Sequence, residues 1–145
     1  MLSLVKLKVF YIVNSADRQG VSMIAGLGID VVEIDRIQQS LTRFGVHFLR
    51  RVLTEKERAA LPASPASYVA ARFAAKEAAV KALGTGFAQG ITLQDVEISN
   101  GQNGEPHISL HGAALLRMQA LGAKHIHVSL THSRQTAAAV VILEA

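Results

Sequence analysis

The sequence predicts an α+β fold in which a mainly antiparallel sheet packs with one long central helix. Three observations predict it. A short β-branched apolar run opens the domain, an alanine-rich stretch with helical spacing occupies its middle, and the last third has the pattern of a hairpin, a helix and two strands. Strands and helices in such an order are typical of α+β domains with antiparallel pairing.

The length of 145 residues corresponds to one ordinary domain that can bury a substantial core. Hydrophobic residues make up 50% of the chain, which excludes disorder as a description of the whole. The chain has no cysteine, so disulfides, thiolate metal sites and cysteine nucleophiles are excluded, and this fits a reducing compartment. No apolar run approaches the roughly 18 residues that cross a bilayer, and we expect no membrane partner.

Residues 1–22 are predicted to form an N-terminal extension, and the domain proper is expected at residues 23–145. Lys6 and Lys8 interrupt the apolar start of the chain, whereas a secretory signal has an uninterrupted apolar core. A linker-like polar stretch follows at residues 14–20. The alternative is that the β-prone start adds an edge strand to the domain.

The formal net charge of +4 is too mild to indicate a nucleic-acid-binding surface. Aromatic residues make up only 5% of the chain and tryptophan is absent, so we expect no surface on which bases stack. The sequence therefore predicts no nucleic-acid partner.

The domain is predicted to begin with a buried strand at residues 23–34, because this run is short, apolar and β-branched. Asp35 is expected to cap the helix that follows, with Gln38 as its capping-box-like partner. Gly45 stops this helix after Phe44.

A second helix is predicted at residues 46–52. Thr54 and Glu57 have the spacing of a capping box, which opens a third, short helix that Pro62 ends.

The long alanine-rich helix is predicted to run to Leu83 from an N-cap at Ser64, with Pro65 at its first position. Its core stripe is formed by apolar residues at helical spacing, namely Val69, Phe73, Val80 and Leu83.

The last part of the domain is predicted to hold one glycine-rich loop and five further elements. They are a loop at residues 84–90, a hairpin of residues 92–99 and 106–110, a helix at residues 112–121 stopped by Gly122, and strands at residues 125–130 and 136–143.

Several ionisable side chains have neighbours in the sequence that suggest a catalytic or ligand-binding role. Asp30 lies inside the apolar first strand, where a carboxylate is costly unless it is paired or holds a metal; an exposed edge position or a capping role is the alternative. Glu77 and Lys81 are spaced i, i+4 on the long helix, which an ordinary solvated pair would also explain. Lys81 precedes the loop that contains Gly84 and Gly86, and a lysine beside such a loop suits an anionic ligand.

The segment from Ser129 to Ser133 places hydroxyls and an imidazole at the end of a strand. These groups could bind phosphate or substrate, or simply form a turn whose polar groups are satisfied. His125 and His127 alternate on one strand face without an obvious third ligand, so a zinc site is not expected.

Four basic residues have a spacing that could make a stripe. Arg36, Arg43 and Arg50 are seven residues apart, with Arg51 beside the last, and they share a face if their helices are roughly continuous. Such a stripe is either a solvated face or a docking surface for an acidic partner.

Four motifs in one order resemble the bacterial holo-[acyl-carrier-protein] synthases, which are small 4′-phosphopantetheinyl transferases. The resemblance runs from Met23 to the C-terminus, and residues 1–22 lie outside it. The motifs are Gly26-x-Gly-Ile-Asp30-x-x-x-Ile34-x-Arg36-Ile37, Phe48-x-x-Arg51-x-Leu53-Thr54-x-x-Glu57, Arg72-Phe-Ala-Ala-Lys-Glu-Ala-x-x-Lys-Ala-Leu-Gly-Thr-Gly86 and Ser129-x-Thr-His132.

The resemblance implies a 4′-phosphopantetheinyl transferase-like fold and a cytoplasmic, magnesium-dependent enzyme of fatty acid biosynthesis. Such an enzyme transfers 4′-phosphopantetheine from coenzyme A to a serine of apo-acyl carrier protein and releases 3′,5′-ADP. It also implies a homotrimer with active sites between subunits. The alternative is a catalytically silent module of the same fold that binds coenzyme A or another anion.

The resemblance also assigns roles to individual residues. Asp30 and Glu77 match the metal carboxylates, and with Lys81 they form the expected catalytic set. Glu77 is the expected general base, either directly or through a metal-bound water, and a second water held by Asp30 is the alternative. The expected coenzyme A contacts are Lys81, Gly84, Thr85, Gly86, Thr131 and His132, and the expected carrier-protein contacts are Arg36 and Arg43.

Overall fold

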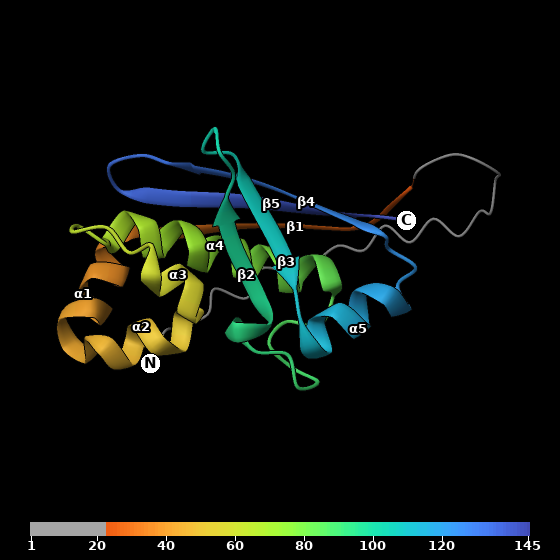
Figure 1. Ribbon diagram of the computed structural model, residues 1–145, viewed down its shortest axis with the longest axis horizontal. Helices are drawn as coiled ribbons and strands as arrows, with labels where there is room; N and C mark the ends of the chain where they lie inside the picture. Colours follow the sequence, from red (N-terminus) through yellow and green to blue (C-terminus); the bar gives the residue numbers. More distant parts are fainter. Residues whose placement is uncertain (1–22) are drawn as a thin grey trace.

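A three-stranded sheet and a separate hairpin both contact the long helix α4 in the computed structural model, which describes residues 23–145 (Figure 1). The elements are β1 (Ile24–Glu33), α1 (Ile34–Phe44), α2 (Val46–Val52), α3 (Glu55–Ala59), α4 (Ala66–Leu83), the 3-10 turn η1 (Leu93–Asp95), β2 (Val96–Asn100), β3 (Pro106–Leu110), α5 (Gly112–Ala120), β4 (His125–His132) and β5 (Thr136–Glu144). The predicted α+β architecture with antiparallel strands is confirmed. The predictions for residues 1–22 lie outside the described residues.

The three-stranded sheet has the order β1-β5-β4, and both pairings are antiparallel. Alternate residues of the central strand β5 are buried, because one face of the sheet packs on α4. The register places Asp30 opposite Ala139 and Ala139 opposite Leu130. Asp30 is therefore directed toward the helix-covered face of the sheet.

Helix α4 lies unusually close to β1 because both elements present small residues to each other. Most of the buried positions of α4 are alanines. On β1, a Cβ atom at Gly26 would overlap the carbonyl oxygen of Ala82, and one at Gly28 would overlap that of Ala78. The glycines thus permit a close backbone approach, which brings the side chains that flank them on both elements together.

The other side of α4 contacts a layer built from α3 and the β2–β3 hairpin. Its centre is a fully buried ion pair between Lys76 Nζ and Glu57 Oε2, 2.8 Å apart. Lys76 also donates to the carbonyls of Leu93 and Val96, at 2.9 and 2.7 Å. Glu57 accepts from the backbone N–H of Ile98 at 2.8 Å. These bonds fix α3 and the hairpin against the middle of α4.

Two expectations about β1 and the helix after it are wrong. The strand is not buried on both faces, because it lies at the edge of the sheet and alternates between covered and exposed positions. The cap of α1 is Glu33 rather than Asp35, and it makes no side-chain capping bond. Asp35 lies in the first turn, where a negative charge is favourable beside the helix N-terminus.

Three smaller corrections concern the long helix and the hairpin. The N-cap of α4 is Pro65 rather than Ser64, and no side chain caps it. Phe73 is only half-buried, and alanines fill much of the predicted core stripe. The residues just before β2 form the turn η1, because Thr92 and Asp95 make a capping box there.

The remaining predicted helix caps and helix ends agree with the described structure. Thr54 and Glu57 form the capping box that opens α3. Gly84 ends α4, and Gly122 follows α5 with a positive φ of 73°, as a helix stop requires. Among residues 23–145, no helix is both long and apolar enough to cross a membrane.

Candidate active site

Asp30 and Lys81 form an ion pair across the contact between β1 and α4. Their Oδ1 and Nζ atoms are 2.6 Å apart, and both side chains are 16% exposed. The ammonium also donates to the carbonyl oxygen of Ile29 at 3.0 Å. Asp30 is therefore neither a capping group nor a solvated edge residue, and the explanation by pairing is the right one.

Glu77 lies one turn before Lys81 on α4 and faces the same region. Burial raises the pKa of Glu77 above its ordinary value, and the neighbouring charge of Asp30 raises it further, while Lys81 opposes the shift. Burial also raises the pKa of Asp30, and the hydrogen bond and charge of Lys81 oppose it. Two half-buried carboxylates that repel each other favour a bound cation or a bound proton.

These two carboxylates could hold a magnesium ion. Mg²⁺ commonly takes one or two protein carboxylates and completes its shell with water and phosphate oxygens. Asp30 and Glu77 could provide these carboxylates, and the ammonium of Lys81 beside them suits a phosphate group.

The glycine-rich loop begins as the C-cap of α4. Gly84 has a left-handed backbone with φ 75°, and its N–H bonds to the carbonyl of Lys81 at 3.0 Å. The N–H groups of Thr85 and Gly86 both bond to the carbonyl of Val80 at 3.2 Å. These donors already have partners in the helix end, so a ligand would meet this loop by close approach to its backbone and to the Thr85 side chain.

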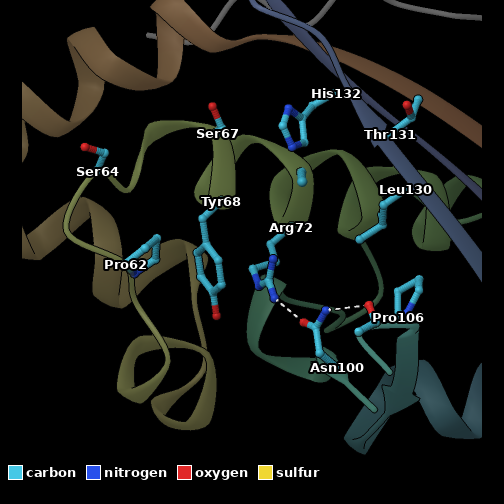
Figure 2. A pocket seen from close by; sticks show the side chains of 12 residues that line it. Pro62, Ser64, Ser67, Tyr68, Arg72, Asn100, Pro106, Leu130, Thr131 and His132 are labelled. Carbon is cyan, nitrogen blue, oxygen red and sulfur yellow. Dashed lines mark hydrogen bonds between the residues drawn. The ribbon is translucent and has the colours of Figure 1, made fainter. Parts of the chain in front are cut away.

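Thr131 and His132 lie near the end of β4 and line a pocket beside the first half of α4. The pocket has a volume of about 440 Å³, and Tyr68, Arg72 and Asn100 also line it (Figure 2). The strand register pairs Thr131 with Ala138 and His132 with Ala137, so the two side chains are directed to opposite faces of the sheet.

Arg72 is the principal residue of this pocket that the sequence did not single out as a site residue. It is only 7% exposed, and its Nη2 donates to Asn100 Oδ1 at 2.7 Å. Its buried Nε has no hydrogen-bond partner in the described part of the chain. A buried N–H of a charged group without a partner is unusual and suggests a ligand site. The sequence signal that could have identified Arg72 as a site residue is its position as a charged residue within an alanine-rich helix.

The structure therefore gathers the expected site residues in two places. Asp30, Glu77 and Lys81 come together between β1 and α4, whereas Thr131 and His132 lie with Arg72. Arg72 and Glu77 project about 140° apart around the axis of α4. The two places are thus on different sides of one helix.

The basic residues do not form one continuous stripe. Gly45 separates α1 from α2 with a φ of 51° and a ψ of −127°, which is far from helical. Arg36 and Arg43 remain on α1, and the guanidinium of Arg43 lies 5.0 Å from the ring centroid of Phe44. The exposed side chains of Phe44 and Val46 lie beside Arg43 in the chain. This end of α1 therefore presents both positive charge and apolar surface.

Residues 26–141 match the model of a family described as the 4′-phosphopantetheinyl transferase superfamily. The holo-[acyl-carrier-protein] synthase of Solidesulfovibrio magneticus is 62% identical over 122 residues, which cover 84% of this chain and 99% of that protein. The crystal structure of the synthase from Neisseria meningitidis superposes with a TM-score of 0.77 at 33% identity, covering 85% of this chain and 100% of that chain. The synthase from Bacillus anthracis, solved in complex with CoA (3′,5′-ADP), gives a TM-score of 0.71 at 37% identity, covering 85% and 98%.

Proposed function

The chain belongs to the 4′-phosphopantetheinyl transferase superfamily, and we propose that it acts as a holo-[acyl-carrier-protein] synthase. It transfers 4′-phosphopantetheine from coenzyme A to a serine of apo-acyl carrier protein and releases 3′,5′-ADP. The observation that carries this proposal is the cluster of Asp30, Glu77 and Lys81 between β1 and α4. Its charges suit a divalent cation and a pyrophosphate together.

The reaction is an attack of the serine oxygen on the β-phosphorus of the coenzyme A pyrophosphate. The bond from this phosphorus to the bridging oxygen breaks, and 3′,5′-ADP leaves with that oxygen. The serine proton passes to Glu77, the residue that the resemblance to the family gives as the general base. A water held by Asp30 is the alternative acceptor.

Asp30 and Glu77 would hold the magnesium ion. When bound, Mg²⁺ supplies positive charge that stabilises the negative charge developing on the phosphoryl oxygens. Lys81 donates two hydrogen bonds to protein oxygens, and its third N–H is left for a phosphate oxygen. Because the ion pair fixes the Lys81 ammonium, little reorganisation is needed when charge develops.

A second subsite for an anionic part of coenzyme A is the pocket of Arg72 and His132. A mostly buried guanidinium with a free N–H and an imidazole are suitable donors for phosphate oxygens. The carrier protein docks on α1 through Arg36 and Arg43, since acyl carrier proteins are acidic and this end of α1 is basic.

The enzyme assembles as a homotrimer with active sites between subunits. The outer face of β1 exposes Leu27, Ile29 and Val31, which are 52%, 54% and 63% exposed. Such an apolar edge is typical of a surface that a partner covers. Thr131 lies on the same face of the sheet as Val31, because both pair with Ala138. The number of subunits comes from the resemblance to the family, as do the role in fatty acid biosynthesis and the cytoplasmic location.

Intact-mass analysis tests this function. Apo-acyl carrier protein is incubated with the protein, coenzyme A and Mg²⁺, with and without a chelator. We expect a mass gain of one phosphopantetheine group that the chelator abolishes and that Glu77→Ala prevents. Glu55→Ala, which removes an exposed carboxylate at the start of α3, is the matched control and should retain the gain. Binding of coenzyme A with no mass gain would instead support the silent module.

A further inference from the structure

Tyr68 and Arg72 form a stacked pair on successive turns of α4. The Cζ atom of Arg72 lies 3.4 Å from the centroid of the Tyr68 ring. Figure 2 shows the ring beside the arginine side chain, which reaches toward Asn100. A guanidinium on the face of an aromatic ring gains a cation–π attraction, which is stronger when the pair is shielded from water.

The ring of Tyr68 is itself held in place. Its hydroxyl donates to the carbonyl oxygen of Glu57 at 2.7 Å, and Glu57 is buried and bound to Lys76. Burial raises the pKa of Tyr68, and the charge of Arg72 opposes this, so the phenol stays protonated and remains a donor near neutral pH. Tyr68 therefore connects Arg72 to the rigid contact between α3 and α4.

The guanidinium is restrained on one face and at one edge. The ring covers a face, and the amide of Asn100 accepts from Nη2 at 2.7 Å. That amide is fixed in turn, because its Nδ2 donates to the carbonyl of Gly104 at 3.0 Å. An arginine side chain has many rotamers, and restraining them before a ligand arrives lowers the entropy lost on binding.

We infer that Tyr68 is a positioning residue, which holds the Arg72 guanidinium ready to donate to phosphate oxygens of coenzyme A. This inference rests on the proposed function. The ring does not touch the reacting atoms, and its effect on the reaction passes through Arg72. Coenzyme A offers two sources of such oxygens, the pyrophosphate and the 3′-phosphate of the ribose.

The test compares Tyr68→Leu, which removes the ring, with Tyr68→Phe, which keeps the ring and removes only the hydroxyl. From the size of a cation–π contact, we expect Tyr68→Leu to raise the KM for coenzyme A by about 3- to 30-fold. The kcat and the KM for the carrier protein should change less than about 2-fold. Tyr68→Phe should lie between the wild type and Tyr68→Leu. A purely structural role would instead lower the thermal midpoint and alter the kinetic constants of both substrates together.

A double-mutant cycle with Arg72→Ala decides whether the effect passes through the arginine. In the Arg72→Ala background, Tyr68→Leu should have no further effect on the KM for coenzyme A. An undiminished effect in that background, or an unchanged KM in Tyr68→Leu alone, would overturn the inference. Repeating the cycle with 3′-dephospho-coenzyme A identifies the source. An effect lost with this substrate indicates the 3′-phosphate, and one retained indicates the pyrophosphate.

Calorimetric binding of 3′,5′-ADP to the unliganded variants separates this inference from the proposed function. If the wild type transfers no phosphopantetheine but Tyr68→Leu still weakens 3′,5′-ADP binding, the function fails and the inference stands. If transfer occurs and Tyr68→Leu changes neither the KM for coenzyme A nor the binding of 3′,5′-ADP, the inference fails and the function stands.

Discussion

Replacing Lys76 by methionine should destabilise this protein more than almost any other single change of charge. Lys76 and Glu57 have fully buried side chains whose charged atoms are 2.8 Å apart. Methionine is close in volume to lysine, so it removes the ammonium without opening a large cavity. The variant leaves the carboxylate of Glu57 buried without its counter-ion, and it leaves the carbonyls of Leu93 and Val96 without a donor.

The magnitude follows from these lost contacts. Breaking a buried ion pair by removing one partner costs about 3–5 kcal/mol. A domain of this size has a free energy of unfolding of about 6–18 kcal/mol, so the loss is a large fraction of the total. We expect the thermal midpoint to fall by about 15 °C. Glu57 keeps its hydrogen bonds from the N–H groups of Thr54 and Ile98, which limits the cost to this range.

Urea unfolding at pH 7 measures the effect, and Lys56→Met is the matched control. Lys56 also pairs with a carboxylate, Glu97, but at 3.4 Å and with a side chain that is 83% exposed. That variant should lose at most about 1 kcal/mol. Adding Glu57→Gln to Lys76→Met removes the unpaired charge and should recover about 1–2 kcal/mol. Equal losses for the two lysine variants, or no recovery in the double variant, would refute the reasoning.

Two further variants test the charged groups of the two binding surfaces. The raised pKa of Glu77 means that the folded state binds the proton of this carboxyl more tightly than the unfolded state does. Protonation of Glu77 therefore stabilises the folded state; this contribution is fully present below pH 4.5 and is lost as the pH rises through the raised pKa. In chelator, Glu77→Gln should therefore have a higher thermal midpoint than the wild type at pH 7, and the difference should shrink toward pH 4; a lower midpoint at pH 7 would contradict this. Arg36→Ala combined with Arg43→Ala should raise the KM for the carrier protein at low salt and flatten its dependence on salt. Lys124→Ala, an exposed cation outside α1, is the control, and an unchanged salt dependence in the double variant would reject docking on α1.

Sequence patterns predicted the elements that depend on local signals. The capping box of Thr54 and Glu57 and the glycine stop after α4 are both encoded within a few residues. Asp30 could be singled out as well, because a carboxylate inside an apolar strand conflicts with its surroundings.

Contacts between distant parts of the chain could not be predicted in this way. Arg72 meets Asn100 across the hairpin layer, and no local pattern links an arginine in an alanine-rich helix to that strand. The sequence placed Glu57 in a capping box, but its ion pair with Lys76 depends on how α3 packs on α4. The exposed face of β1 was missed for a related reason. An apolar strand has the same composition whether a layer of its own chain or another subunit covers it.

The position of the two subsites on different sides of α4 leads to a complementation experiment. Arg72 and Lys81 are about 13 Å apart along the helix axis, and Arg72 and Glu77 project in different directions. If each active site takes Glu77 from one subunit and Arg72 from its neighbour, Glu77→Ala assemblies lack the general base at every site, and Arg72→Ala assemblies bind coenzyme A weakly at every site. The two variants then complement each other when they are mixed and assayed at a coenzyme A concentration well below the KM of Arg72→Ala. Random assembly of equal amounts in a ring of subunits restores about a quarter of the wild-type sites. The two chains are refolded together and assayed by carrier-protein mass gain, with each variant refolded alone as the control. Sites contained within one chain would give no activity in the mixture beyond that of the Arg72→Ala chains alone, because every chain would then lack one of the two residues.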